Sequence, residues 1–324
     1  MFEFDDNLNS ICKRFAGVNY KIEKLNGGIN NPTYLFFNKK YKFVLKQIKA
    51  EPSPTFNNYL AEKQLLTLAS TVAVTNVPKL ISALDNERVL ILEYIQPDNI
   101  ENLFNVNLFS IKECINFIKK LNSDPQLSHK TITQRAADSS CKLSEHILNI
   151  DLRISNFNTD HLPTELNTKA SELLSLLVKK WGGLKNESIE YLNNNPSINT
   201  IDENFMIVSP SDFGFHNIII KNNKLVFIDF EFSGWDDPAK MYCDFILQPK
   251  FQIPREFYNL LNENFLNKEY RNLYKDRTYW LYKLLKFKWY TIRHSYLNKD
   301  KFKRNEYDFN FLKLKIENSK NELL

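Results

Sequence analysis

Features that mark several common protein classes are missing from this sequence of 324 residues. No stretch approaches the roughly 18 consecutive apolar residues of a membrane-spanning helix, so no membrane partner is expected. The first residues, MFEFDDNLNS, are acidic and have no long apolar run, unlike a secretory signal. The cysteines Cys12, Cys114, Cys141 and Cys243 lie far apart, which favours buried thiols over a disulfide framework or a zinc site. We therefore expect a cytoplasmic protein.

A strong excess of one charge is also missing. The chain has 43 Lys and Arg against 38 Asp and Glu, a net charge of +5, which is too small by itself to indicate a nucleic-acid partner. Hydrophobic residues make up 43% and charged residues 25%, as is usual for a globular protein. The length exceeds that of a typical single core and favours two lobes or domains.

Glycine is scarce, with seven in the chain, so the position of each is informative. Gly17 and the pair Gly182-Gly183 follow stretches with helical character and are expected in ordinary turns. The others lie in segments that carry further functional signals: Gly27, Gly28, Gly214 and Gly234.

The first 96 residues predict a small antiparallel sheet with one prominent helix. Strand-like runs occupy residues 20–25, 33–37, 41–48 and 88–95. Short turns join the first three, which is the pattern of a meander. Between the third and fourth runs, residues 57–69 space their leucines as an amphipathic helix does. Pro97-Asp98 ends the last run, so we place the boundary of an N-terminal lobe, residues 1–96, near Pro97.

The remainder, residues 97–324, is mostly helical by its periodicity. Helices are expected at 108–122, 140–152, 164–181, 255–268 and 276–297. The fold class is therefore α+β, with a small sheet-bearing lobe followed by a larger helical one.

The richest chemical signal is the segment SPSDFGFHNIIIKNNKLVFIDFEF, residues 209–232. Asn222-Asn223 is a good two-residue turn, and folding about it pairs Ile220 with Leu225. The pairing then places Asn217 opposite Ile228, with Asp229 diagonally adjacent. Strict alternation along the strands would point Asn217 and Asp229 to opposite faces, so they converge only if the strand ends are irregular.

The polar residues of this hairpin suit a phosphate-handling site. An Asp and an Asn with oxygens close together suit a hard cation such as Mg²⁺, which takes phosphate oxygens as further ligands. A further carboxylate, here Asp212, can position a hydroxyl and accept its proton. Asp and Asn are also common loop formers that bond their own backbone, which is the structural alternative for each residue alone.

The spacing Asp212, Asn217 and Asp229-Phe230-Glu231 resembles the catalytic segment of the aminoglycoside phosphotransferase and choline kinase family. These small-molecule kinases share a two-lobed protein-kinase-like fold. The resemblance implies that Asp212 is the catalytic residue and that Asn217 and Asp229 hold the metal. It also implies a strand lysine paired with a helix glutamate; Lys46 in YKFVLKQ and Glu62 in the amphipathic helix match in order and spacing.

The resemblance implies further nucleotide contacts in the first lobe. The segment NGGINN, with Gly27, Gly28 and Asn30, fits the loop that covers phosphates, although it lacks a full G-x-G-x-x-G and a plain hairpin turn is the alternative. Backbone groups near Glu93 and Ile95 are expected to bind the adenine edge.

The sequence also departs from the family pattern. Pro210-Ser211-Asp212 stands where the family usually has His-Gly-Asp, which puts the internal hydrogen bonding of this loop in question. His216, beside Asn217, either contacts phosphate or packs against its surroundings.

The resulting hypothesis is a Mg²⁺-dependent phosphotransferase that moves the γ-phosphoryl group of ATP or GTP to a hydroxyl of a small molecule. The acceptor, whose pocket is expected within residues 99–200 and 246–324, is left open among a sugar, an amino alcohol and an aminoglycoside, and so is the oligomeric state. A pseudokinase or nucleotide-binding regulator is the main alternative. A nucleic-acid binder that uses the basic, aromatic segment 275–304 is less favoured, because an apolar helical face explains that segment as well.

Overall fold

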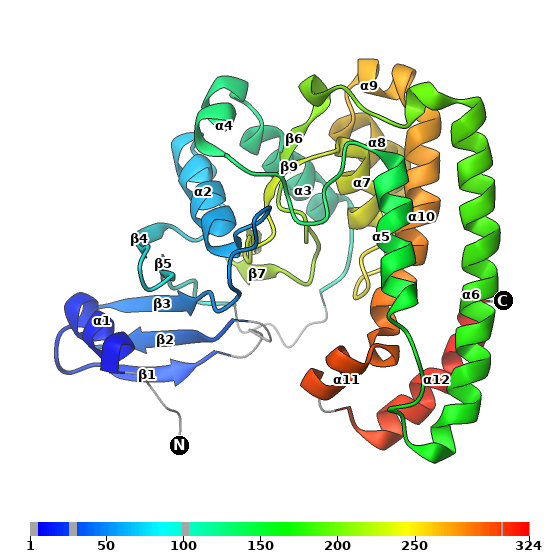
Figure 1. Cartoon of the computed structure of the whole chain (residues 1–324). Coiled ribbons are helices and arrows are strands. Elements are labelled where there is room, and N and C mark those ends of the chain that lie inside the picture. Colours follow the sequence, from blue (N-terminus) through cyan, green and yellow to red (C-terminus); the bar gives the residue numbers. More distant parts are fainter. Residues whose placement is uncertain (1–5, 26–30, 99–103, 306, 324) are drawn as a thin grey trace. The chain divides into compact units, whose positions relative to one another are not determined.

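The computed structural model describes residues 6–25, 31–98, 104–305 and 307–323 (Figure 1). The chain forms two compact units, each built from two stretches of sequence. Unit 1 comprises Met1–Ser139 and Met206–Phe265, and unit 2 comprises Ser140–Phe205 and Leu266–Leu324. The lobe boundary near Pro97 falls within unit 1 and stays a prediction.

Unit 1 contains a five-stranded antiparallel sheet in the order β1-β2-β3-β5-β4 (Figure 1). Its strands are β1 Lys21–Lys24, β2 Thr33–Phe37, β3 Lys42–Gln47, β4 Leu80–Leu84 and β5 Val89–Glu93. The first three form the expected meander, and β5 inserts between β3 and β4 with the pairs Phe43↔Glu93 and Leu84↔Val89. The predicted sheet is therefore confirmed.

Two helices pack on this sheet or beside it. Helix α1, Asp6–Ala16, buries one apolar face, which includes Leu8 and Ile11, against Phe36, Leu45 and other apolar residues of the sheet. It ends at Gly17, whose φ of +78° and N–H bond to Lys13 O (2.8 Å) are those of a left-handed helix cap. The predicted turn at Gly17 is thus confirmed.

Helix α2, Asn58–Thr71, begins at Asn57, whose side chain accepts from the Leu60 N–H at 3.2 Å. It buries Leu65 and Leu66, as its periodicity predicts, and it also buries Glu62.

The rest of unit 1 surrounds a cluster of phenylalanines. Its helices are α3 Leu108–Leu121, α4 Pro125–Thr131, α7 Pro238–Ile246 and α8 Tyr258–Phe265. Its short strands are β6 Ile207–Ser209, β7 Ile218–Lys221, β8 Lys224–Phe227 and β9 Gly234–Asp236. Phe117 of α3 stacks on Phe227 with ring centroids 4.5 Å apart, and Phe213 lies 5.0 Å from Phe245 of α7. These contacts join the segment around β7 and β8 to the helices.

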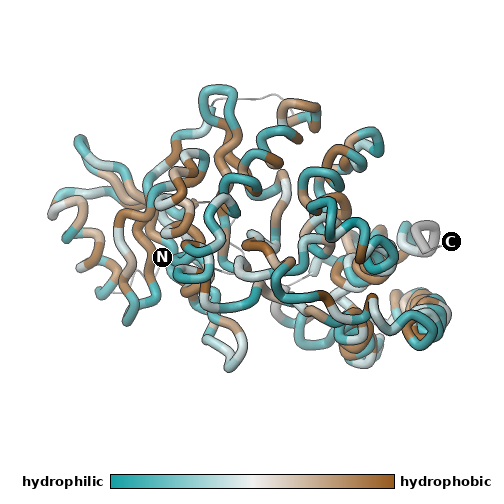
Figure 2. Tube along the Cα trace, turned by 90° about the horizontal axis from the view of Figure 1, so that it is seen from above, coloured by the Kyte–Doolittle hydropathy of each residue, from teal (hydrophilic) through white to brown (hydrophobic). Residues whose placement is uncertain are grey.

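Unit 2 is helical throughout the part that the structure describes. It contains α5 Leu143–Ser155, α6 Thr164–Asn194, α9 Lys268–Leu273, α10 Lys275–Arg293, α11 Lys299–Asn305 and α12 Phe309–Leu323. Helices α5, α6 and α10 pack on one another, and α12 packs on α6 (Figure 1). Apolar and polar stretches alternate along the helices (Figure 2), so each presents an apolar side to its neighbours.

The helices expected from the sequence are present, but several of their ends differ from the predicted ones. All five helices predicted after residue 97 are present, and the α+β fold class is confirmed. All four cysteines are buried thiols, as expected. None of the described helices combines the length and apolar character that crossing a bilayer requires.

One turn prediction is wrong. Gly182 and Gly183 lie inside α6, which continues to Asn194 without a break. The glycines lower helix propensity, but Trp181 just before them is buried and donates to Asp151 of α5 at 2.6 Å. Lys185 just after them binds the same carboxylate at 2.5 Å. Tertiary contacts on both sides thus outweigh the propensity of two residues.

Replacing Gly183 by Ala should stabilise the protein by about 0.5–1 kcal/mol, because an added Cβ meets no atom within 4 Å and the helical backbone loses less entropy on folding. Urea unfolding monitored by circular dichroism measures this change. Gly17→Ala is the matched control: its site is equally open, but its φ of +78° is unfavourable for alanine, so that variant should lose stability. Equal effects of the two variants would contradict this account.

Candidate active site

The hairpin β7–β8 has the register that the sequence predicts. Ile220 pairs with Leu225, and the Ile228 N–H donates to Asn217 O at 3.0 Å, which continues the pairing beyond the strands. Asn222 and Asn223 form the turn with φ of 51° and 57°. Two successive left-handed residues match the twist of the flanking strands, and Asn tolerates this conformation well.

The irregularity required at the open end of the hairpin is present at Asp229. Strand β8 ends at Phe227, and Asp229 has a φ of 66°. Residues other than glycine rarely adopt this conformation, and when they do they often lie at functional sites. This conformation interrupts the alternation of side chains along the strand. The side chain of Asp229 therefore need not point to the face that strict β geometry would give it.

Lys46 of β3 lies among three carboxylates. Its Nζ is 2.7 Å from Glu62 Oε2 of α2, 2.6 Å from Asp229 Oδ1 and 3.9 Å from Glu231 Oε2. The expected Lys46–Glu62 pair is therefore formed. Asp229, which is 183 residues after Lys46 in the sequence, is the other close partner of the lysine. The side chains of Lys46 and Glu62 are 9% and 2% exposed, whereas that of Asp229 is 41% exposed. Asp229 is thus the member of the group that remains open to a ligand.

Burial and charge set the protonation of this group. Burial alone would lower the pKa of Lys46, but Glu62, Asp229 and Glu231 outweigh it and raise that pKa, so the ammonium stays charged. Burial raises the pKa of Glu62, against the attraction of Lys46. Burial also raises the pKa of Glu231, to about 7, with the neighbouring carboxylates adding to the effect.

Asp212 lies in the loop between β6 and β7, and its carboxylate is held by two neighbours. His216 Nε2 lies 3.1 Å from Oδ1, and Asn217 Nδ2 lies 3.3 Å from Oδ2 and donates to the Asp212 backbone oxygen at 3.0 Å. Burial tends to raise the pKa of Asp212, but His216, Asn217 and the charge of Lys240 together lower it. Asp212 is therefore ionised at neutral pH. His216 is thus hydrogen-bonded to Asp212, and its contact with phosphate stays a prediction.

The unusual residue before Asp212 is accommodated by local hydrogen bonds. Ser211 has a φ of 66°, a conformation that a glycine at this place would adopt without strain. Its N–H donates to Ser209 Oγ at 3.0 Å, and its hydroxyl donates to Ala137 O at 3.2 Å. These bonds hold the loop in a shape that its sequence does not favour.

The carboxylates near Lys46 could hold a metal ion. One oxygen each from Glu62, Asp229 and Glu231 lies within 4.8 Å of the others. Oxygen ligands of this kind suit a hard cation such as Mg²⁺ and do not suit a soft one. Carboxylate oxygens suit the chemistry of the expected metal, and the group contains Asp229 but not Asn217, so the predicted ligand pair stays a prediction.

Sequence reasoning missed two residues of this group. Glu231 stands in the Asp-Phe-Glu run, where the motif assigns it no role. Asn31 gave no signal at all: it is 3% exposed, donates through Nδ2 to Glu231, and accepts the Lys49 N–H at 2.9 Å. It thus ties the start of β2 to the carboxylate group.

The predicted nucleotide contacts of the first lobe are partly visible. Gly27, Gly28 and Asn30 lie outside the described residues. The Glu93 N–H already donates to Lys79 O at 2.9 Å, and the Glu93 carboxylate accepts the Lys79 N–H at 3.3 Å. In the described part of the chain, the backbone of Ile95 has no such partner, so the adenine contact expected there stays a prediction.

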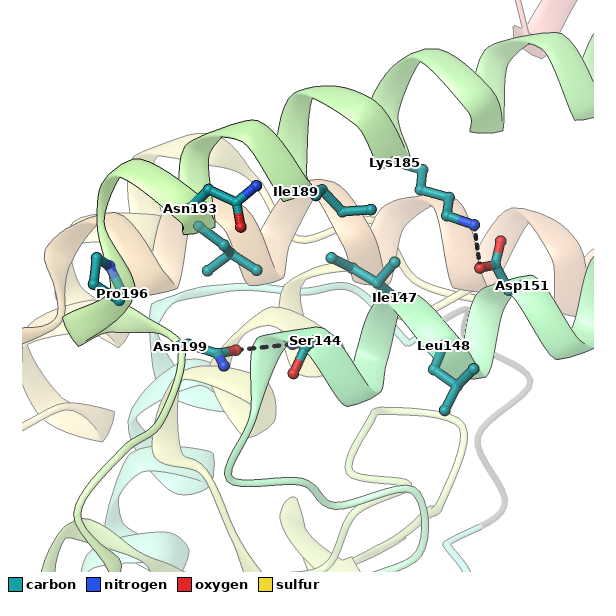
Figure 3. A pocket seen from close by; sticks show the side chains of 10 residues that line it. Ser144, Ile147, Leu148, Asp151, Lys185, Ile189, Asn193, Pro196 and Asn199 are labelled. Carbon is teal, nitrogen blue, oxygen red and sulfur yellow. Dashed lines mark hydrogen bonds and ion pairs between the residues drawn. The ribbon is translucent and has the colours of Figure 1, made fainter.

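A groove of about 480 Å³ lies elsewhere, in unit 2, between α5 and α6 (Figure 3). Its walls are apolar at Ile147 and Ile189, and its charged groups bind each other, since Lys185 pairs with Asp151. Ser144 is likewise fixed through its N–H to Asn199 Oδ1 at 3.0 Å. None of the predicted site residues lines this groove.

The basic segment 275–304 does not form one continuous charged surface. Arg277 is fully buried and donates to the carbonyls of Ile198 and Asn199 at 3.0 and 2.6 Å. Lys288 is buried too, and Lys283 binds Glu187 at 2.8 Å. The apolar face of α10 is buried at Leu281, Leu284 and Leu285, as the packing explanation expects.

Removing the Glu62 charge should lower the free energy of unfolding by about 3 kcal/mol, because Glu62→Gln breaks one side of a buried ion pair. Urea unfolding measures the loss. Lys63→Met, at the next position, is the control: its partner Asp85 is 64% exposed, so the expected loss is under about 1 kcal/mol. Similar losses in the two variants would show that the Lys46–Glu62 pair is no more important to the fold than a surface pair.

Comparisons with known proteins address the fold. No family model and no curated protein matches the sequence. Solved structures do match across nearly the whole chain. A choline/ethanolamine kinase family protein from Mesorhizobium loti shares 15% identity, with 98% of this chain and 93% of that one covered and a TM-score of 0.59. A spectinomycin phosphotransferase in complex with ADP and spectinomycin shares 12%, with 98% of each chain covered and a TM-score of 0.60.

A third match is an ADP-bound aminoglycoside phosphotransferase, at 16% identity, with 98% and 97% of the two chains covered and a TM-score of 0.53. At these identities the likeness concerns the fold and not the activity. The chain has the protein-kinase-like fold that aminoglycoside phosphotransferases and choline/ethanolamine kinases share, as its hairpin motif predicts.

Proposed function

We propose that this protein is a Mg²⁺-dependent phosphotransferase that moves the γ-phosphoryl group of ATP or GTP to a hydroxyl of a small molecule. The observation that carries the proposal is the ammonium of Lys46, which is held between Glu62 and Asp229 at 2.7 and 2.6 Å. A buried cation fixed by a helix carboxylate, beside a more exposed carboxylate, is the arrangement that kinases use to bind nucleotide phosphates.

Lys46 serves as the phosphate-binding cation. Burial opposes its charge, but the surrounding carboxylates raise its pKa, so it is charged at neutral pH. Glu62 fixes its position from α2, and Asp229 occupies its remaining side until a nucleotide arrives. An incoming phosphate competes with Asp229 for the same ammonium, which would leave Asp229 oxygens for the metal.

Asn217 and Asp229 would hold the metal, with Glu231 as a further oxygen ligand. These residues would thereby place at the phosphates a positive charge that offsets the negative charge of phosphoryl transfer. The position of the two residues at the open end of the β7–β8 hairpin supports this assignment. The exposure of the Asp229 side chain, at 41%, supports it as well.

Asp212 would orient the acceptor hydroxyl and accept its proton. An ionised carboxylate offers about four acceptor positions. His216 and Asn217 use two of them and fix the orientation of the group. The remaining positions are available to a hydroxyl, and the lowered pKa keeps Asp212 ready to accept at neutral pH.

The acceptor is proposed by class only: a sugar, an amino alcohol or an aminoglycoside-like compound. Structural neighbours that are spectinomycin, aminoglycoside and choline/ethanolamine kinases support a small polyhydroxyl or amine-bearing acceptor. A pseudokinase is the alternative. The presence of Lys46, Glu62, Asp212, Asn217 and Asp229 together in unit 1 favours turnover over it.

The metal assignment predicts that nucleotide binding depends on Mg²⁺. Titration calorimetry with ATP, and separately with GTP, should show binding that strengthens when Mg²⁺ is present, and Asp229→Ala should weaken the Mg²⁺-dependent binding at least about tenfold, or 1.4 kcal/mol. Asp85→Ala, which removes an exposed carboxylate of the same unit, should bind like the natural protein. Failure of the natural protein to bind either nucleotide would refute the proposed function.

The catalytic assignment predicts a separation of binding from turnover. Asp212→Asn keeps the shape of the side chain but removes its charge, so phosphoryl transfer should fall about 10²–10⁴-fold while nucleotide affinity stays within about threefold. A mass-spectrometric screen of hydroxyl compounds for a product heavier by one phosphoryl group supplies the assay. Nucleotide binding with no transfer by the natural protein, over a broad screen, would favour the pseudokinase.

A further inference from the structure

A fully buried lysine that the proposed chemistry does not use lies next to the catalytic loop. Helix α7 begins at Pro238, with Asp237 as its N-cap, whose carboxylate accepts the Ala239 N–H at 2.8 Å. Lys240 is the third residue of this helix and is 1% exposed. It lies four residues after Asp236 of β9 and four residues before Asp244 of α7.

Lys240 joins these two acids into one buried ion group. Its Nζ lies 3.0 Å from Asp236 Oδ2 and 3.0 Å from Asp244 Oδ2, and the two aspartates are 0% and 8% exposed. Burial alone would lower the pKa of Lys240, but the two carboxylates raise it, so the lysine remains charged. A buried group of this kind is often no more stable than apolar residues of the same volume, so fold stability alone does not explain it.

The group is connected to the catalytic loop through β6. Asp236 pairs with Ile207, and Gly234 pairs with Ser209, the last residue of β6. The chain then passes through Pro210 and Ser211 to Asp212. Helix α7 packs against β6, and Lys240 is one of the charges that act on Asp212.

The same segment also holds the loop from its other end. Gln248, just after α7, accepts the Phe215 N–H at 2.8 Å and donates to Phe245 O at 2.9 Å. Gln248 is 6% exposed, so this bond is shielded from water. Residues 236–248 therefore contact the chain both before and after Asp212, and Lys240 fixes the start of this segment.

We propose that Lys240 is a positioning residue for phosphoryl transfer: by binding Asp236 and Asp244 together, it holds β9 and α7 in the arrangement that sets the place of Asp212. The inference rests on the proposed function and deepens it. Without Lys240, two buried carboxylates repel each other across the helix start, and the β6–β9 pair that carries the loop loses its anchor. A displacement of about 1 Å at a catalytic group can lower a rate about 10²-fold.

Lys240→Met, an apolar side chain of similar length, tests the proposal. We expect the kcat for transfer to the acceptor found in the mass screen to fall about 10²-fold. The KM for nucleotide and the calorimetric affinity for Mg²⁺-ATP should stay within about threefold, because Lys46, Asn217 and Asp229 are not touched. The control is Lys63→Met, which removes an exposed lysine of the same unit and should leave kcat and KM unchanged.

The outcomes separate the inference from the proposed function. No transfer by the natural protein refutes both. If the natural protein transfers phosphate and folded Lys240→Met has an unchanged kcat, the inference alone is refuted. The inference is also refuted if the kcat of the variant falls only in proportion to the fraction of it that is folded. Should Lys240→Met not fold, Asp236→Asn decides, since it keeps the size of the side chain and removes one ion contact: a tenfold or larger fall in kcat at constant nucleotide affinity supports the positioning role, and an unchanged kcat overturns it.

Discussion

The ammonium of Lys46 is the group on which the rest of the candidate site depends. A charge buried this deeply is stable only if carboxylates surround it, and here they come from α2 and from the segment after β8. The sheet supplies the lysine, the helix supplies Glu62, and the hairpin supplies Asp229. Misplacing the sheet or α2 would break the pair between the two buried charges, Lys46 and Glu62, and misplacing the hairpin would remove the second close partner of Lys46.

The second condition of the site is backbone conformation. Ser211 and Asp229 both have the left-handed backbone conformation. Ser211 directly precedes the predicted catalytic residue Asp212, and Asp229 is itself a predicted metal ligand. Neither is a glycine, so each costs energy that neighbouring hydrogen bonds or ion pairs must offset. For Asp229 the bond to Lys46 provides this, and for Ser211 the bonds to Ser209 and Ala137 do.

Local sequence patterns predicted much of this arrangement. The meander, α2 and the register of β7–β8 follow from apolar periodicity and a two-residue turn, which are signals within about ten residues. Lys46, Glu62, Asp212 and Asn217 were found because their order matches a known motif. Periodicity failed where tertiary contacts decide, as in α6, where Trp181 and Lys185 hold Asp151 across two glycines.

Buried polar partners were the least predictable part. Asp236 at the end of β9 and Lys240 and Asp244 on α7 are charged residues, for which the sequence alone predicts a solvated surface, but the fold buries all three. Asn31 is similar, since a polar residue before a strand gives no sign that it reaches a glutamate two hundred residues away. Sequence spacing predicts contacts within one helix or between adjacent strands. The partners of these residues lie close only because unit 1 as a whole is folded.

The contact between Lys46 and Asp229 closes a loop of 183 residues, and unit 1 is interrupted by the first stretch of unit 2 between Ser139 and Met206. During synthesis Lys46 and Glu62 leave the ribosome long before Asp229, so the third partner can be added only after most of the chain exists. Completion of the ion group around Lys46 is thus a late folding event. Until that stretch is made, Glu62 is the one carboxylate of the group that Lys46 can contact.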